Sequence, residues 1–325
     1  MMNKETLLST DHTAWISRRG FIGGMAASVA VASKADSPAT FDPNTIALIA
    51  DTHIPGQVYK GWAKDFSFQP RRLKKVVADI LAMRPLPAQV IHFGDVAYLF
   101  GKRVDYEAAA TLLKPLQDVG IKVNLMMGNH DKKAALQEVF PEYSTRKEQA
   151  ERIAYSVETP YADFLLLDSC NETVRENKDY DWGTGNIDPD QRTWMMDKLK
   201  AATKPTFVCA HHSPFELRLT DSLMKSLPAV AGFIHGHEHV WRKDWFHGAY
   251  NDVRTIRSLS LPSTGHTGDI GYAVMRLHPD RAVVEVYQDD FYFPFAVYDE
   301  KKRPADWSIH VAENKGQTCT FLYRP

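Results

Sequence analysis

Five short motifs rich in aspartate and histidine are the part of this sequence best suited to chemistry. In chain order, the motifs are Asp51-Thr52-His53, Gly94-Asp95, Gly128-Asn129-His130-Asp131, His211-His212 and Gly236-His237-Glu238-His239. Each follows an apolar run, and the five runs are residues 46–50, 90–93, 123–127, 207–210 and 230–234. Short apolar runs bounded by turn residues predict buried strands. Because ligands of layered α/β proteins bind beyond the carboxyl ends of strands, we expect the motifs to converge on one site.

The donor types in these motifs indicate a metal site. Oxygen donors mixed with imidazole nitrogens, without thiolates, suit Zn, Mn, Fe or Ni. The side chains that qualify as ligands are Asp51, His53, Asp95, Asn129, His211, His237 and His239. This set is too large for one four-coordinate zinc and suits two metals that share a carboxylate. Paired metals about 3.5–4 Å apart clamp the attacking and leaving oxygens in phosphoryl chemistry, so the motifs predict a dinuclear phosphoesterase.

The elements that must position these motifs are predicted from hydrophobic periodicity. Apolar residues recur at helical spacing in residues 71–83, 106–119 and 190–199. Further strands are expected at residues 153–157 and 164–167, and an antiparallel pair at residues 272–277 and 282–287. Strands that alternate with helices through the first half predict an α/β fold in which helices cover buried sheets.

The motifs resemble the calcineurin-like metallophosphoesterase family, whose pattern is D-x-H, G-D, G-N-H-[DE], H and G-H-x-H. The similarity extends over residues 46–290, and all five motifs occur in the family's order. The resemblance implies a four-layer α-β-β-α sandwich of two mixed sheets flanked by helices. It also implies that a hydroxide bridging two divalent or trivalent metal ions (Fe, Mn or Zn) attacks a small phosphoester without a covalent enzyme intermediate.

The resemblance further implies a role for each matched residue. The ligands divide into a first set, Asp51, His53 and His239, a second set, Asn129, His211 and His237, and the bridging Asp95. His130 would lie beside the phosphate, where it protonates the leaving oxygen or stabilises its charge. Asp131 would orient His130.

Two positions leave alternatives open. His212 competes with His211 for one ligand position, and the family's H-H-P segment favours His211, with His212 facing the pocket. Tyr98 completes a Gly94-Asp95-Val96-Ala97-Tyr98 segment that is also similar to the G-D-x-x-Y of purple acid phosphatases, where the tyrosine binds ferric iron. Those enzymes lack the histidine of D-x-H. We therefore expect His53 to be the ligand and Tyr98 to lie in the pocket wall or behind a ligand.

Two polar segments are candidates for the walls of the pocket, with solvent-exposed filler as the alternative for both. Residues 171–185 follow a predicted strand, and loops at strand ends commonly carry recognition. Residues 261–269 could present hydroxyls or an imidazole to a phosphate. His266 in this segment matches no motif, and His92 is expected to be a packed histidine because it lies within an apolar run.

The amino terminus carries a twin-arginine export motif. Ser17-Arg18-Arg19-Gly20-Phe21-Ile22 matches S-R-R-x-F-[IL], and Ala30-Val31-Ala32 offers a small-x-small cleavage site. The apolar stretch between them is shorter than the about 20 residues that span a bilayer, so no stable membrane span is expected. We expect a signal peptide at residues 1–32, a linker at 33–45 and the metallophosphoesterase domain at 46–325. The twin-arginine export machinery would then deliver the protein to the bacterial periplasm or the exterior.

The composition fits one enzyme domain and favours no nucleic-acid partner. The chain has 325 residues, 44% of them hydrophobic, and its formal net charge is −1. Near-zero charge without a basic stripe gives no electrostatic footprint for nucleic acid. The three cysteines, Cys170, Cys209 and Cys319, are too few for a disulfide scaffold, and the sequence does not identify a pair.

The sequence therefore favours an exported phosphoesterase with a dinuclear metal centre and a small phosphoester substrate. The D-x-H motif favours a phosphodiester, whereas Tyr98 favours a monoesterase similar to purple acid phosphatases. Some members of the fold lose ligands and serve as non-catalytic scaffolds. Retention of all seven candidate ligands and His130 favours an enzyme over a scaffold.

Overall fold

The computed structural model describes residues 40–60, 67–170, 184–247, 254–292, 311 and 313–324. They lie in one compact unit, Ala39–Pro325. The predicted signal peptide and residues 171–183 of the first polar segment lie outside the described residues. Among the described residues, no helix is both long enough and apolar enough to cross a membrane.

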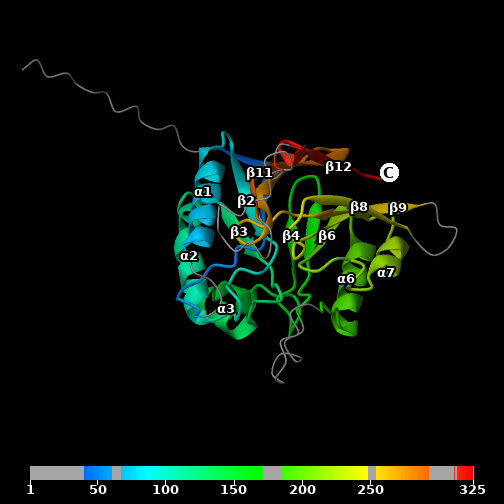
Figure 1. Ribbon diagram of the computed structural model, residues 1–325. Coiled ribbons are helices and arrows are strands. Elements are labelled where there is room, and N and C mark those ends of the chain that lie inside the picture. Colours follow the sequence, from blue (N-terminus) through cyan, green and yellow to red (C-terminus); the bar gives the residue numbers. More distant parts are fainter. Residues whose placement is uncertain are drawn as a thin grey trace, which may run out of the picture. The chain divides into compact units, whose positions relative to one another are not determined.

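Two six-stranded sheets form the centre of this unit (Figure 1). The first sheet has the order β12-β11-β10-β1-β2-β3. Its strands are β1 (Phe41–Ile49), β2 (Leu86–His92), β3 (Lys122–Leu125), β10 (Gly268–Leu277), β11 (Arg281–Tyr292) and β12 (Thr318–Leu322). Strands β1, β2 and β3 are parallel, and the other pairs are antiparallel. The predicted antiparallel pair is β10 and β11, which is confirmed.

The second sheet is also mixed, with the order β4-β5-β6-β7-β9-β8. Its strands are β4 (Tyr155–Glu158), β5 (Asp163–Leu166), β6 (Thr206–Ala210), β7 (Val230–His235), β8 (Arg242–His247) and β9 (Thr255–Ser260). Strands β5, β6, β7 and β9 are parallel, whereas β4 and β8 are antiparallel edge strands. The carboxyl ends of β6 and β7 therefore lie at the same edge of this sheet.

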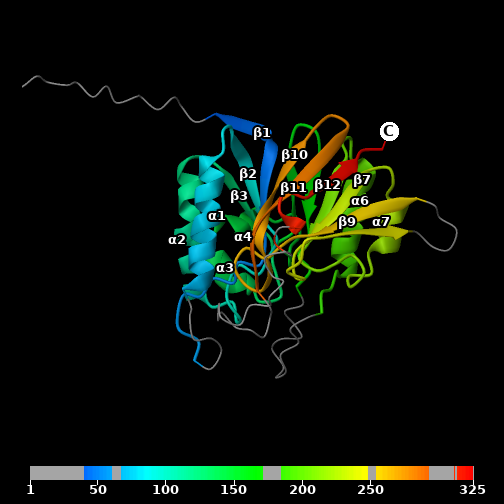
Figure 2. The same cartoon turned by 45° about the horizontal axis from the view of Figure 1, so that its top comes forward.

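Helices cover the outer face of each sheet, which confirms the α/β fold of two mixed sheets flanked by helices (Figure 2). The helices beside the first sheet are α1 (Phe68–Ala82), α2 (Arg103–Asp118), α3 (Lys133–Val139) and α4 (Glu142–Thr145). Those beside the second sheet are α6 (Pro189–Ala201) and α7 (Thr220–Lys225). The apolar residues of α1, from Leu73 to Ile80, are buried at the helical spacing that the sequence predicts.

The two sheets pack directly against each other through aromatic side chains. Phe207 of β6 lies 5.1 Å, between ring centroids, from Phe321 of β12, and 5.3 Å from Phe164 of β5. Gly232 of β7 faces Phe321, and a Cβ atom there would overlap the Phe321 ring. The absence of a side chain at Gly232 lets the two sheets approach each other closely at this point.

Some elements differ from the expectation. Strand β1 begins at Phe41, so the carboxyl-terminal part of the predicted linker 33–45 is strand. Phe41 and Asp42 pair with Leu86 and Pro87 of β2. These strand residues alternate between exposed and half-buried and carry no apolar run, so the pattern missed them. The edge strand β8 was missed for the same reason, since its side chains are mostly exposed, whereas β12 alternates exposed residues with the buried Cys319 and Phe321 and has no continuous apolar run.

We predict that the Phe207→Ala substitution destabilises the domain. Phe207 is fully buried between the sheets, and removal of a buried phenylalanine ring costs about 3–5 kcal/mol. The matched control is Phe215→Ala, because Phe215 is 52% exposed and its loss should change stability by about 0.5 kcal/mol or less. Urea unfolding of the metal-free protein measures both. Equal losses in the two variants would contradict the role of Phe207 at the sheet interface.

Candidate metal centre

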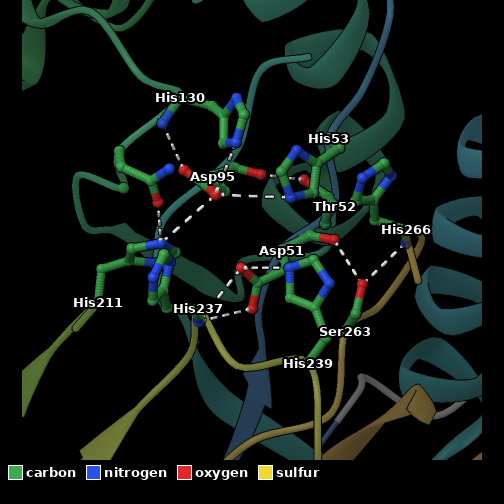
Figure 3. Close-up of polar contacts among 12 residues, drawn as sticks. Asp51, Thr52, His53, Asp95, His130, His211, His237, His239, Ser263 and His266 are labelled. Atoms are coloured by element: carbon green, nitrogen blue, oxygen red, sulfur yellow. Dashed lines mark hydrogen bonds and ion pairs between the residues drawn. The ribbon is translucent and has the colours of Figure 1, made fainter. Parts of the chain in front are cut away.

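The five motifs occupy the loops that follow the carboxyl ends of parallel strands. Asp51-Thr52-His53 follows β1, Gly94-Asp95 follows β2, and the Gly128 motif follows β3. In the second sheet, His211 follows β6 directly, and His237 follows β7. The structure brings the side chains of these motifs together at one place (Figure 3). The centre is therefore built from both sheets.

Backbone hydrogen bonds between the loops hold the motifs at this edge. Asp51 N donates to Gly94 O (3.1 Å), and His53 N donates to Asp95 O (2.9 Å). Two glycines permit the close approach. A Cβ atom on Gly128 would overlap the backbone and carboxylate of Asp95, and one on Gly94 would lie 2.8 Å from His211 Nδ1. The glycines of G-D and G-N-H-D are thus required by the proximity of the loops.

The backbone is strained at five of the seven candidate ligands. These residues have left-handed φ angles: Asp51 (52°), His53 (45°), Asp95 (54°), His237 (68°) and His239 (55°). Non-glycine residues adopt this region infrequently, and such conformations persist where the surrounding structure enforces them. Here the strain turns side chains of adjacent loop residues toward a common centre, an arrangement typical of functional sites.

The first set of candidate ligands is Asp51, His53 and His239. Their donor atoms all lie within 4.8 Å of one another, and His239 Nε2 is 3.2 Å from Asp51 Oδ1. His53 Nε2 faces Asp95 Oδ2 at 3.5 Å. This nitrogen is buried and makes no hydrogen bond within the described part of the chain. A buried polar atom without a partner is costly, and a bound cation would supply one.

The second set lies on the other side of Asp95. His211 Nε2 is 2.8 Å from Asn129 Oδ1 and 3.4 Å from Asp95 Oδ2. The ring of His237 lies 5.0 Å from that of His211, between centroids. Asp95 Oδ2 therefore faces a histidine of each set, His53 and His211, as a bridging carboxylate would.

The electrostatics of the centre favour cations. Burial raises the pKa of Asp95, but His211 and His130 outweigh it and hold the pKa well below its ordinary value. Burial lowers the pKa of His211, but the neighbouring Asp95 raises it to about 9. Two buried carboxylates, Asp51 and Asp95, thus draw positive charge to the site. Oxygen and imidazole donors around this charge fit a pair of metal ions such as Fe, Mn or Zn.

His130 lies beside Asp95, and a backbone carbonyl orients its ring. His130 N donates to Asp95 Oδ1 (2.7 Å), and its ring Nε2 is 4.0 Å from Asp95 Oδ2. Ring Nδ1 lies 2.9 Å from the carbonyl oxygen of Leu99. Leu99 itself has a left-handed φ of 47°, so a further strained residue aims this carbonyl at the ring. No sequence motif identified Leu99.

The Asp131 carboxylate accepts four hydrogen bonds beneath the motifs. Its Oδ1 accepts hydrogen bonds from Ala97 N (3.1 Å) and Tyr106 Oη (3.0 Å). Its Oδ2 accepts from Gly128 N (2.9 Å) and Val96 N (3.2 Å). These donors converge beneath the loops, so the Asp131 carboxylate ties the G-D loop to the G-N-H-D loop. The Leu99 carbonyl lies at His130 Nδ1, and the expectation that Asp131 orients His130 stays a prediction.

Two of the remaining histidines lie where the sequence suggested. His212 Nδ1 is 2.8 Å from Ser169 Oγ, and its ring is 4.6 Å from His237. Its donor atoms group with those of His211 and His237, so His212 faces the second set. His92 is packed in the interior, where Nε2 lies 2.9 Å from Thr52 Oγ1, and burial lowers its pKa to about 4.

His266 packs against His53 of the first set, and Tyr98 lies near His266. The ring of His266 is 4.2 Å from that of His53, and 6.2 Å from that of Tyr98. Tyr98 also contacts Tyr59 at 5.1 Å, and burial raises its pKa to about 12. Sequence reasoning identified the segment 261–269 as a candidate wall but gave His266 no role. The signal that the sequence offered for His266 was its position shortly before the predicted strand at residues 272–277.

Comparisons with known proteins agree with this geometry. Residues 45–241 match the calcineurin-like phosphoesterase family. The chain is 28% identical over 263 residues to a probable cyclic nucleotide phosphodiesterase of Rhodopseudomonas palustris, covering 73% of this chain and 89% of that protein. Its fold is similar to that of a dimetal phosphatase from Danio rerio, with 16% identity, 89% and 100% coverage and a TM-score of 0.59. PhoD is similar at 11% identity, 89% and 71% coverage and a TM-score of 0.50.

We predict that Tyr98→Phe leaves the metal content of the protein unchanged, whereas His53→Ala removes about one metal ion per chain. His53 Nε2 lies 3.5 Å from Asp95 Oδ2, and the Tyr98 ring packs against Tyr59. Metal analysis of iron-reconstituted protein, with visible absorption spectra, measures both. A ferric–tyrosinate band that disappears in Tyr98→Phe would instead assign Tyr98 to iron.

Proposed function

This chain belongs to the calcineurin-like phosphoesterase family of metal-dependent hydrolases, and from that premise we propose that it hydrolyses a small phosphodiester with two bound metal ions. The observation that carries the proposal is the position of Asp95. Its buried carboxylate lies between two sets of donors contributed by the two sheets. Such a site suits a pair of metals that share one carboxylate.

The proposed ligands follow the two sets. Asp51, His53 and His239 hold one metal, Asn129, His211 and His237 hold the other, and Asp95 contacts both. When bound, a metal pair of this kind makes a hydroxide nucleophile available near neutral pH and neutralises the charge of the phosphoryl oxygens. The protein contributes fixed ligand positions, because the strained loops and glycines leave the side chains little freedom.

His130 is the proposed proton donor to the leaving oxygen. The Leu99 carbonyl accepts a hydrogen bond from Nδ1–H, which fixes the ring and leaves Nε2 directed toward Asp95. When the ring is protonated, Nε2 carries a proton that it can give to the departing alkoxide. His130 is thus a catalytic residue that need not bind metal.

A phosphodiester is the favoured substrate class. His53 occupies the D-x-H position beside Asp95, and the relative in Rhodopseudomonas palustris is a probable cyclic nucleotide phosphodiesterase. The second candidate is a phosphomonoesterase similar to purple acid phosphatases, because Tyr98 of the G-D-x-x-Y segment lies near His266, which packs against His53 of the first set. A non-catalytic metal-binding scaffold is the third.

Turnover of bis-p-nitrophenyl phosphate should exceed that of p-nitrophenyl phosphate in protein reconstituted with Mn, Zn or Fe, and a chelator should abolish it. Asp95→Asn and His239→Ala should lose both turnover and metal, because each removes a proposed ligand. His130→Ala should keep its metal while kcat falls about 10²–10⁴-fold, the usual contribution of a positioned acid. Rates and metal content are measured on the same preparations.

Each contrary outcome of this experiment has a distinct meaning. A preference for the monoester favours the phosphomonoesterase. Metal binding without chelator-sensitive turnover of either substrate favours the scaffold. Unchanged activity in Asp95→Asn and His239→Ala would contradict the metal mechanism altogether, and loss of metal in His130→Ala would make His130 a ligand.

We also infer that the protein is exported in its folded state to the periplasm or beyond. The twin-arginine motif at residues 17–22 and the cleavage site at residues 30–32 support this inference. Export after folding allows metal supply in the cytoplasm, rather than affinity order, to select the metals that occupy the site.

Replacement of both arginines, Arg18→Lys with Arg19→Lys, should retain the uncleaved chain in the bacterial cytoplasm. The matched control is Met25→Leu, which preserves the apolar stretch and should be exported like the natural sequence. Cell fractionation and the mass of the amino terminus measure the result. Equal export of the double-lysine variant would contradict the twin-arginine route.

A further inference from the structure

One loop contacts all three residues of the first ligand set, either at the side chain or at the backbone. This loop, residues 263–269, precedes and enters β10 and is called the supporting segment below. In the sequence this segment is separate from the D-x-H and G-H-x-H motifs. In the structure it lies beside both (Figure 3). None of its residues belongs to the five motifs.

The amino-terminal half of the supporting segment is fastened to the loop that carries Asp51 and His53. Ser263 Oγ donates to Asp51 O (2.9 Å), and Thr264 N donates to Ala50 O (2.7 Å). His266 N in turn donates to Ser263 Oγ (2.8 Å), which places the His266 ring 4.2 Å from the ring of His53. The strained backbone at Asp51 and the ring of His53 are therefore both held from this side.

The carboxyl-terminal half of the segment holds His239. Thr267 Oγ1 lies 3.0 Å from His239 Nδ1, and Asp269 N donates to His239 O (2.8 Å). His239 Nε2 faces Asp51 Oδ1. For Nε2 to offer its lone pair to a metal, Nδ1 must carry the proton and needs an acceptor, which the Thr267 hydroxyl provides.

The second ligand set is held in another way. His211 Nδ1 lies 2.7 Å from the backbone carbonyl oxygen of Phe93, so its acceptor comes from the main chain of the β2 loop. His237 N donates to the Asp51 carboxylate (3.2 Å to Oδ2). A side-chain change in the supporting segment would thus act on the first set and leave the Phe93 carbonyl in place.

We propose that the supporting segment, through Thr267 as a positioning residue, sets the metal affinity of the first subsite alone. The inference rests on the proposed function for the identity of the ligands. The hydroxyl of Thr267 fixes the protonation and direction of the His239 ring, and the remainder of the segment holds Asp51 and His53. Loss of an outer hydrogen bond to a metal-binding histidine typically weakens metal binding about 10–100-fold.

The test is a titration of the full purified chain with Mn²⁺ by equilibrium dialysis. Thr267→Val removes the hydroxyl and keeps the shape of the side chain. This substitution should lower the affinity for one of the two Mn²⁺ ions by about 10–100-fold and change the affinity for the other by less than about twofold. Thr267→Ser, which restores the hydroxyl, should bind as the natural sequence does. The matched control is Thr111→Val, because Thr111 on α2 is exposed and its hydroxyl bonds to a helix carbonyl.

Two further backgrounds identify the subsite. In the His237→Ala background, which lacks a ligand of the second subsite, Thr267→Val should still lower the affinity for the remaining Mn²⁺ ion. In His239→Ala, it should have no further effect, because residues that act through one another are not additive. Unchanged affinities in Thr267→Val, an equal loss at both ions, no recovery in Thr267→Ser, or an undiminished effect in His239→Ala would each overturn the proposal. Two bound ions without hydrolysis in the natural sequence would overturn the proposed function but not this inference.

Discussion

The buried carboxylate of Asp95 is the group on which the arrangement of the centre depends. It lies at the carboxyl end of β2 in the first sheet and faces His211, which follows β6 in the second. A charge removed from water is costly unless positive or hydrogen-bonding groups surround it. His53, His211 and the amide of His130 meet this need from separate loops. The packing of the two sheets through Phe207 and Phe321 therefore has a chemical consequence, because it brings those groups to one carboxylate.

The loops that carry the candidate ligands have strained backbone conformations. Residues such as Asp51 and His53 stand two apart in a loop, yet both side chains point to one centre, and left-handed φ angles achieve this. Hydrogen bonds to Gly94, Asp95 and Ser263 hold the conformation. Donor groups whose positions are fixed by the backbone in this way suit electrostatic catalysis, which relies on preorganised polar groups.

The two proposed metal subsites differ in what supports them. His211 is oriented by the main-chain carbonyl of Phe93, which no substitution at that position removes. His239 is oriented by the side chain of Thr267, which a single substitution can change. The first subsite is therefore the one that sequence variation outside the motifs can tune. Asp131 shows a related principle for the backbone, because its carboxylate ties the G-D loop to the G-N-H-D loop.

The sequence by itself determined the buried strands, the main helices and the seven candidate ligands, because apolar runs and periodicity are local and the motifs lie at their ends. It also indicated that the motifs converge, since parallel strands end at one edge. It did not reveal the first residues of β1 or the edge strand β8, whose largely exposed side chains leave no apolar pattern. Only the tertiary structure revealed the contacts of Leu99, Asp131, His266 and Thr267 at the centre. Their contacts join residues far apart in the chain or depend on a single φ angle, and neither leaves a signal in residue spacing.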